Sequence, residues 1–247
     1  DSLARLVLEH AEGNVLYDRI DDLDHALGYG LLRASTHPDP RKRAQANEKR
    51  MKLFVEVLMR RRGGDISGAP LMEEWLMALL SLFYSQKSPL PAHFLPFGIV
   101  PGTDEFTALV NGCALPEIRA KFQALEGMKP RTLRTEVGSI SRLVNAVFRS
   151  HEFIERAGGG EWLVPFIQGG GTLIAERGDA DEDVCRTVYG GIDMLVTEHC
   201  ESRPGPWPPV GMWLDECTNA RTAGVFEEKK AGETRKYKLV WRFICQH

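Results

Sequence analysis

The spacing of apolar residues divides the chain into two α/β ends and a helical middle. Residues 2–10 place apolar side chains at helical spacing, and 14–20 is a short apolar run that predicts a buried strand. A helix that feeds a strand across a short turn is half of an α/β unit. From 37 to 157 the apolar period is helical. The helices predicted there span 41–62, 69–86, 104–126 and 131–157, with a proline-rich loop between the second and the third.

After the glycines at 158–160 the pattern returns to alternating strands and helices. The run 171–179 predicts a strand, and Asp179 is placed to cap a helix over 180–199. Two further apolar runs, 210–216 and 239–245, predict strands. Strands in this order favour a parallel sheet, so the fold class is α/β with a large all-helical insertion. The expected domains are 1–36, 37–157 and 158–247.

Composition narrows the setting without indicating a function. The chain has 247 residues, 43% apolar and 26% charged, with a formal net charge of −3. Any nucleic-acid contact must therefore come from a local patch and not from the overall field. No run approaches ~18 uninterrupted apolar residues, so no membrane span is expected in this stretch. Five widely spaced cysteines without a CxxC pair favour reduced thiols and a cytoplasmic location.

The strongest candidate chemistry lies where two of the predicted strands end. Asp215 and Glu216 follow the apolar run 210–214, and Gln246 ends the run that begins at 239. Open α/β sheets bind ligands beyond the carboxyl ends of their strands. There an Asp can hold Mg²⁺, and a Glu can orient or deprotonate a water that attacks a nucleotide. The alternative is that these are ordinary surface acids and a loop amide.

The order of these segments resembles that of the DNA-pumping ATPases of the FtsK–HerA class, in particular the conjugative type IV coupling proteins. Residues 1–13 look like the helix after the phosphate-binding loop, 15–32 like the second strand, and 37–157 like the helical insertion of that family. The segments GGGTLIAERGD, VGMWLDECTNA and KLVWRFICQ look like the resumed core. The resemblance implies a RecA-like P-loop NTPase core that uses ATP and Mg²⁺.

The family pattern also assigns roles to single residues. Asp215 matches the Walker B metal position, Glu216 the catalytic acid-base position and Gln246 the sensor position. The family works as a ring, commonly a hexamer, with nucleotide at subunit interfaces and DNA in the central channel. Relaxases and type IV secretion components are further partners that the resemblance implies. It also implies a cytoplasmic location, at the inner face of the cell membrane if a segment outside this chain provides an anchor.

The chain departs from the family at the phosphate-binding loop. No GxxxxGK[ST] sequence occurs, and the glycine clusters 158–160 and 169–171 are not followed by Lys-Ser/Thr. We interpret both clusters as connections between the helical segment and the sheet. The loop is expected before Asp1 in the parent protein, so this chain alone is expected not to hydrolyse ATP.

A run of arginines at the end of the first long predicted helix is the candidate DNA contact. Guanidinium groups bind phosphates bidentately, although such a run is also typical of a solvated helix end. The run consists of Arg60, Arg61 and Arg62. A second hypothesis makes residues 37–157 a docking module for a protein partner or relaxase on a catalytically inactive scaffold. An exposed apolar groove would favour docking, and a continuous basic stripe through Arg41, Arg43 and Arg60–Arg62 would favour nucleic acid.

Overall fold

The computed structural model describes most of the chain, and its fold is predominantly helical with parallel strand pairs. The described residues are 9–10, 13–35, 39–60, 70–88, 90–159, 162–202, 210–215 and 239–244. Of the first predicted helix, only residues 9 and 10 fall within these ranges, and both are helical. No helix among the described residues is long and apolar enough to cross a membrane.

The strands form two parallel pairs. β1 (Val15–Arg19) pairs with β2 (Thr172–Glu176), and β3 (Val210–Asp215) pairs with β4 (Leu239–Ile244). Each pair is in register along its whole length. The prediction of parallel strands in an α/β fold is therefore confirmed. Within the described chain, however, the four strands belong to two separate two-stranded sheets.

The middle of the chain is helical, as predicted, but it contains more helices than expected. They are α2 (Pro40–Arg60), α3 (Pro70–Tyr84), the 3₁₀-helix η2 (Ala92–Ile99), α4 (Asp104–Gly112), α5 (Pro116–Glu126), α6 (Pro130–Phe148) and α7 (His151–Ala157). The predicted helix 104–126 is divided because Pro116 begins a new helix, where its missing N–H costs nothing. The predicted helix 131–157 is divided at Ser150, whose hydroxyl accepts the Phe153 N–H at 3.2 Å.

The structure differs from two further predictions, both in the segment 158–202 that follows the helical part. The glycine-rich connection contains a short helix, α8 (Leu163–Gln168). The following helix, α9 (Glu182–Ser202), begins later than expected. Its first turn is capped by Asp181, whose carboxylate accepts the Val184 N–H at 3.2 Å. Asp179 does not cap this helix, because the helix begins at Glu182 with Asp181 at the cap position; the Asp179 N–H instead donates to the Asp21 carboxylate at 3.0 Å.

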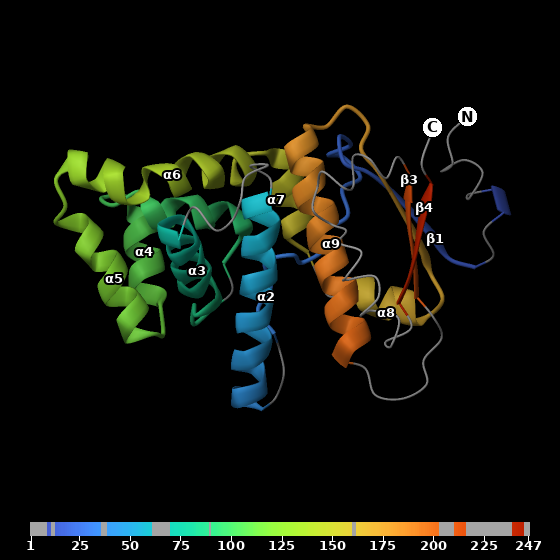
Figure 1. The fold of residues 1–247 in the computed structure, drawn as a ribbon, viewed down its shortest axis with the longest axis horizontal. Helices are drawn as coiled ribbons and strands as arrows, with labels where there is room; N and C mark the ends of the chain where they lie inside the picture. Colours follow the sequence, from blue (N-terminus) through green and yellow to red (C-terminus); the bar gives the residue numbers. More distant parts are fainter. Residues whose placement is uncertain are drawn as a thin grey trace.

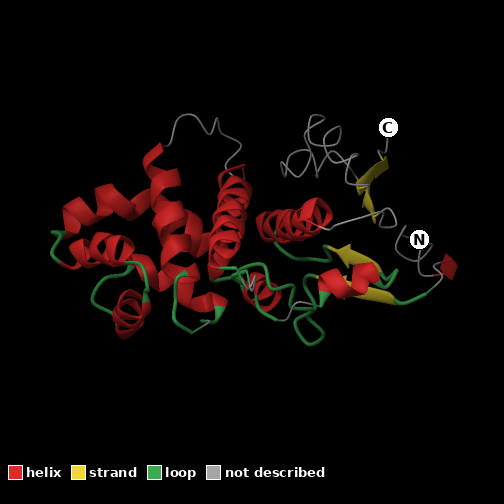
Figure 2. Ribbon diagram, turned by 90° about the horizontal axis from the view of Figure 1, so that it is seen from below, coloured by secondary structure: helices red, strands yellow, loops and turns green. Residues whose placement is uncertain are grey.

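Figures 1 and 2 show most of the helices at one end and in the middle of the molecule, and the strands, with the short helix α8, at the other end. The helices α3 to α6 lie at one end, the strands at the other, and α2, α7 and α9 between them (Figure 1). Helix α9 packs against both α2 and α7. A largely buried ion pair crosses the first of these contacts, with Arg50 Nη2 2.9 Å from Glu198 Oε2. The helical part is thus attached to the α/β part through α9.

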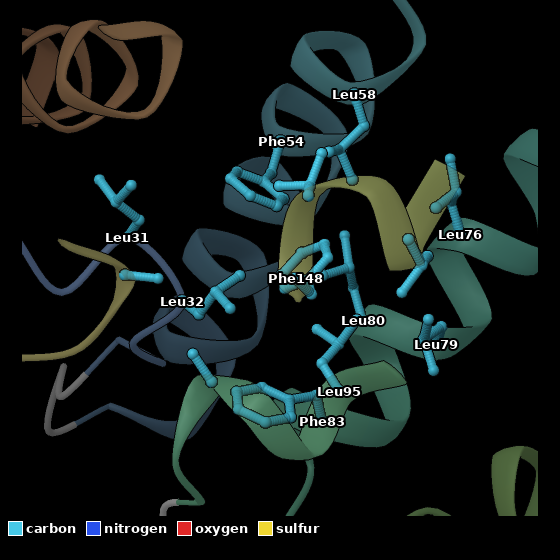
Figure 3. Close-up of a cluster of buried hydrophobic side chains, with 14 of the residues drawn as sticks. Leu31, Leu32, Phe54, Leu58, Leu76, Leu79, Leu80, Phe83, Leu95 and Phe148 are labelled. Carbon is cyan, nitrogen blue, oxygen red and sulfur yellow. The ribbon is translucent and has the colours of Figure 1, made fainter. Parts of the chain in front are cut away.

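The core of the helical part is built from aromatic and aliphatic side chains of several helices (Figure 3). Phe54, Phe148 and Phe153 come from α2, α6 and α7, and all are almost fully removed from water. Their rings meet at centroid distances of 4.9 to 6.4 Å, the range of favourable aromatic pairs. The apolar sides of α2, α6 and α7 therefore face one shared core.

The chain enters and leaves the helical part at the same place. The N–H of Tyr29 donates to the carbonyl of Arg156 at 2.7 Å, and the N–H of Gly30 donates to that of Gly158 at 2.7 Å. A Cβ atom added at Gly28 would lie 2.8 Å from the carbonyl oxygen of Gly158. The two backbones approach so closely that only glycine fits.

Replacing Gly28 with alanine tests this close approach. The new Cβ meets backbone atoms, which cannot turn aside, so we expect Gly28→Ala to lower the free energy of unfolding by about 1–3 kcal/mol. The measurement is urea unfolding followed by circular dichroism. Gly138→Ala is the control, because Gly138 lies within α6 with no atom within 4 Å of its added Cβ. That variant should gain about 0.5–1 kcal/mol. Equal stability of Gly28→Ala and the native chain would contradict the close approach.

Candidate functional site

The strands that carry the predicted nucleotide chemistry are parallel neighbours. Asp215 is the last residue of β3, and its register partner Ile244 is the last residue of β4. Parallel neighbours lie about 4.8 Å apart, so both strands end at one edge of their sheet. The side chain of Asp215, and the whole of Glu216 and Gln246, lie outside the described residues. The roles of these three residues therefore stay predictions.

The arginines predicted to contact DNA lie at the end of α2. Arg60 is its last residue, while the Arg60 side chain, Arg61 and Arg62 lie outside the described residues. Arg41 and Arg43 are exposed at the opposite end, about 28 Å away along the helix axis. Between the two ends, Lys52 Nζ is paired with Glu48 at 2.6 Å. Between Arg41 and Arg43 at one end of α2 and Arg60 at the other, the charge of Lys52 is thus neutralised by Glu48.

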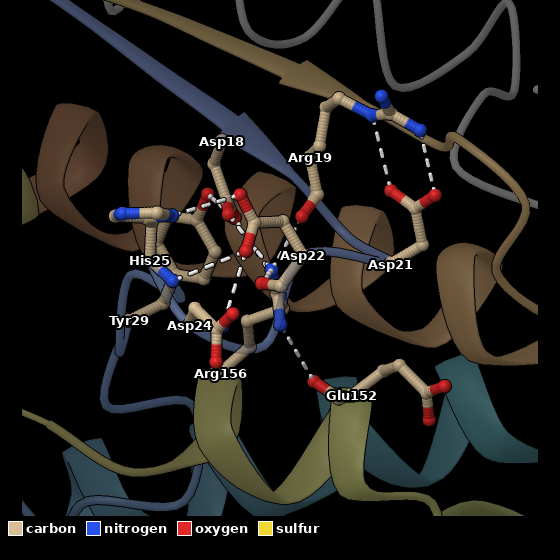
Figure 4. Close-up of polar contacts among 9 residues, drawn as sticks. All are labelled: Asp18, Arg19, Asp21, Asp22, Asp24, His25, Tyr29, Glu152 and Arg156. Atoms are coloured by element: carbon tan, nitrogen blue, oxygen red, sulfur yellow. Dashed lines mark hydrogen bonds and ion pairs between the residues drawn. The ribbon is translucent and has the colours of Figure 1, made fainter.

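A buried ion pair joins β1 to α7. Arg156 is 0% exposed and Asp18 is 2% exposed, and they are the most buried charged pair of the described chain. The guanidinium meets the carboxylate with two nitrogens: Nη2 lies 2.8 Å from Oδ1 and Nε lies 3.2 Å from Oδ2. Figure 4 shows both groups among the residues that follow β1. This bidentate geometry is the strongest that Arg and a carboxylate form.

The remaining polar atoms of the pair are also satisfied. Arg156 donates to the carbonyl of Arg19, the last residue of β1, at 2.7 Å and to that of Asp22, in the turn after it, at 3.0 Å. The Tyr29 hydroxyl donates to Asp18 Oδ2 at 2.6 Å. Burial, together with this bond to a carboxylate, raises the pKa of Tyr29 above its ordinary value, so its proton is kept. A buried charge pair is stable only with such complete hydrogen bonding.

A second polar cluster ties together the loops that follow β1 and β2. Asp21 accepts the N–H of Asp179 at 3.0 Å and pairs with Arg19 at 2.7 Å. The bond from the Asp179 N–H, and then Arg19, hold the pKa of Asp21 below its ordinary range. Gly178 has a φ of +60°, and a Cβ there would lie 2.1 Å from an Asp21 oxygen. The positive φ of Gly178 and its lack of a Cβ therefore allow the turn after β2 to place the Asp179 N–H within hydrogen-bond distance of Asp21.

The chemistry available at this edge is structural. Asp18, Asp21 and Asp22 are each paired with a basic side chain, and the described residues contain no group of three or more His, Cys, Asp or Glu that could hold a metal ion. No role was predicted for Asp18 or Arg156 from the sequence. Two signals were present: Asp18 takes the buried position of a short strand, and Arg156 follows Phe153 by three residues, on the same face of α7.

Comparison with known proteins adds no assignment to this geometry. The chain matches no protein-family model, no curated protein and no solved structure.

Removing one member of the buried pair should be far more harmful than removing both. Arg156→Met leaves the Asp18 carboxylate buried without a cation, so we expect a loss of about 3–5 kcal/mol in the free energy of unfolding. The double variant Asp18→Asn with Arg156→Met should recover part of that loss. Lys52→Met breaks an exposed pair and should change stability by about 0.5 kcal/mol or less. Urea unfolding measures all three, and a loss below about 1 kcal/mol in Arg156→Met would refute the assignment.

The lowered pKa of Asp21 predicts how Asp21→Asn behaves with pH. The carboxylate has a lower pKa folded than unfolded, where it is about 3.9, so its stabilisation is complete above that value. It disappears as the pH falls through the folded pKa. The stability difference between the native chain and Asp21→Asn should be constant above about pH 5 and shrink below about pH 4.

Urea unfolding across this pH range gives the difference directly. Asp24→Asn serves as the control, because the exposed Asp24 carboxylate accepts no hydrogen bond from a described residue. A difference for Asp21→Asn that does not vary with pH would show that the Asp21 charge does not stabilise the fold.

Proposed function

We propose that this chain supplies the Walker B strand and the sensor strand of an ATP-driven DNA translocase similar to the conjugative coupling proteins. The observation that carries the proposal is the pairing of β3 with β4. Asp215 ends one strand directly opposite the end of the other, and Glu216 and Gln246 follow within two residues in the sequence. This order delivers two carboxylates and an amide to one edge of a parallel sheet, where α/β folds bind ligands.

Each of the three residues has a distinct role in the proposal. Asp215 would hold Mg²⁺, an ion that prefers oxygen ligands and that neutralises phosphate charge when bound. Glu216 orients and deprotonates the attacking water, as a general base. The Gln246 amide reaches the terminal phosphate or its water from the neighbouring strand. No lysine of a GxxxxGK[ST] loop is present in the chain, so the phosphate cradle comes from outside these residues.

The arrangement around β1 is consistent with the same reading. β1 and β2 pair in parallel although the helices α2 to α7 lie between them in the sequence, and the chain enters and leaves this helical part at one point. The proposed motor has this order: a core strand, an inserted helical unit and a resumed core. The protein would work as a ring, with ATP at the subunit interfaces and DNA as the substrate that moves.

The docking alternative gains no specific support. An apolar docking groove would gather exposed apolar side chains in one place. Among the described residues of the helical part, the large apolar residues that are exposed are single ones from different segments: Leu71, Val100 and Leu115. Scattered exposures of this kind are common on protein surfaces and indicate no partner.

The test is DNA-stimulated ATP hydrolysis by the full-length protein that carries this chain. Glu216→Gln keeps the size of the side chain but removes its basicity, so kcat should fall about 10²- to 10⁴-fold while ATP binding persists. Glu126→Gln is the control, because Glu126 is exposed at the end of α5, and it should leave kcat unchanged. The 247-residue chain alone should not hydrolyse ATP.

Two results would refute the proposal. One is hydrolysis that is indifferent to Glu216. The other is a full-length protein without any GxxxxGK[ST] loop, since the proposed site needs that loop to hold the phosphates.

A further inference from the structure

The outward face of α6 carries four arginines in a line, which we call the arginine stripe. Its members are Arg131, Arg134 and Arg142 of α6 and Arg149, the cap residue directly after the helix, and all four side chains are exposed. Spacings of 11 and 18 residues are close to three and five helical turns, so Arg131, Arg142 and Arg149 share one side of α6. The stripe is about 27 Å long.

The helix is oriented so that the stripe faces water. The opposite side of α6 is apolar and buried in the core, through Val137, Ile140 and Val144 among others. In Figure 1, α6 runs along one edge of the helical part. Between the arginines, the same face carries short side chains such as Thr135 and a glycine, Gly138. A long, unobstructed surface is left on both sides of the guanidinium groups.

The stripe is not neutralised within the described chain. None of its arginines makes an ion pair with a described residue. Glu136, the only acid of α6, lies about a third of a turn away from the stripe. Four like charges on one face repel one another and gain from a bound anion. In helix α2, by comparison, Lys52 pairs with Glu48 and Arg50 pairs with Glu198, so two of its cations are neutralised.

The amino-terminal end of the stripe is also favourable for an anion. A shallow pocket there is lined by Pro130, Arg131, Arg134 and Thr135. The first turn of α6 contains no acidic residue, and no side chain caps it. The unpaired N–H groups and the positive end of the helix dipole therefore add to the charge of the first two arginines.

We propose that the arginine stripe binds the phosphate backbone of DNA. Arginine forms bidentate hydrogen bonds with phosphate, and a row of exposed arginines along one side of a helix suits a linear polyanion. A helix that binds a membrane surface presents apolar side chains beside its basic ones, whereas the apolar face of α6 is buried in the core. The choice of DNA rests on the proposed function, but the phosphate-binding chemistry of the stripe does not.

The test replaces all four arginines with glutamine in the full chain and measures binding of a fluorescently labelled DNA duplex by anisotropy. The salt dependence is the decisive readout, because each lost phosphate contact lowers the slope of log K against log salt by about 0.9. The slope should therefore become shallower by about 3.6 units, and the affinity at about 0.1 M salt should fall tenfold or more. Arg142→Gln alone should lower the slope by about 0.9 units.

Two matched variants separate the stripe from total charge and from folding. Four arginine-to-lysine replacements at the same positions keep the charge and should keep the slope. Four replacements by glutamine on α2, at Arg41, Lys42, Arg43 and Lys49, remove the same number of exposed cations. The loss of affinity and of salt slope should be clearly smaller in this α2 control than in the variant that lacks the four arginines of the stripe.

Three results would overturn the inference. The first is an unchanged slope in both the fourfold variant and Arg142→Gln, the latter keeping the test valid if the fourfold variant does not fold. The second is an equal loss in the α2 control. The third is stripe-dependent binding to phosphatidylserine vesicles without binding to DNA, which would make the partner a membrane.

The binding assay contains no ATP, so it fails or succeeds separately from the proposed function. A slope that depends on the stripe, together with hydrolysis that ignores Glu216, would leave a DNA-binding protein that is not this motor. An indifferent stripe with hydrolysis that requires Glu216 would leave the motor, with its DNA contacts elsewhere.

Discussion

A carboxylate and a guanidinium that are both removed from water hold the first strand of this protein against the last helix of its helical part. Neither Asp18 nor Arg156 could be buried alone, because each would lose its hydration without a counter-charge. The pair is completed by the Tyr29 hydroxyl and by two backbone carbonyls, one at the end of β1 and one in the turn after it. Two further contacts involve the same segments: α7, which carries Arg156, packs on α9, and the backbone at Gly28 lies directly against that at Gly158 and Gly159.

The pair also explains how two strands far apart in the sequence can lie side by side. Val15 is in register with Thr172, and parallel strands always require a crossover between them. Here the crossover is a whole set of helices with its own aromatic core. That core orders the helices, while the contacts at Tyr29 and Arg156 bring the two ends of the crossover together. Burial of apolar side chains thus forms the helical crossover, and the polar contacts at Tyr29 and Arg156 close it so that β1 and β2 can pair.

Apolar periodicity was sufficient to predict the strands and the helical middle, because burial of one face imposes its period on the sequence. Helix breaks were missed where that period continues across a cap, as at Pro116 and Ser150. The Asp18–Arg156 pair was missed because its members are 138 residues apart and only tertiary structure joins them. The arginines of α6 are plain in the sequence, and the apolar residues that recur on the other side of this helix are buried as their period indicates, but no role was predicted for the arginines. The roles of Asp215, Glu216 and Gln246 still depend on their order in the sequence.

One guanidinium that is bonded to two successive parts of the chain acts as a rigid coupling. Arg156 belongs to α7, yet it holds the carbonyls of Arg19 and Asp22, on either side of Asp21. A shift of α7 that stretches these hydrogen bonds well beyond their ordinary length must therefore be followed by the turn after β1, or the bonds break. Through this one side chain, a displacement of the helical part would be passed on to the end of β1.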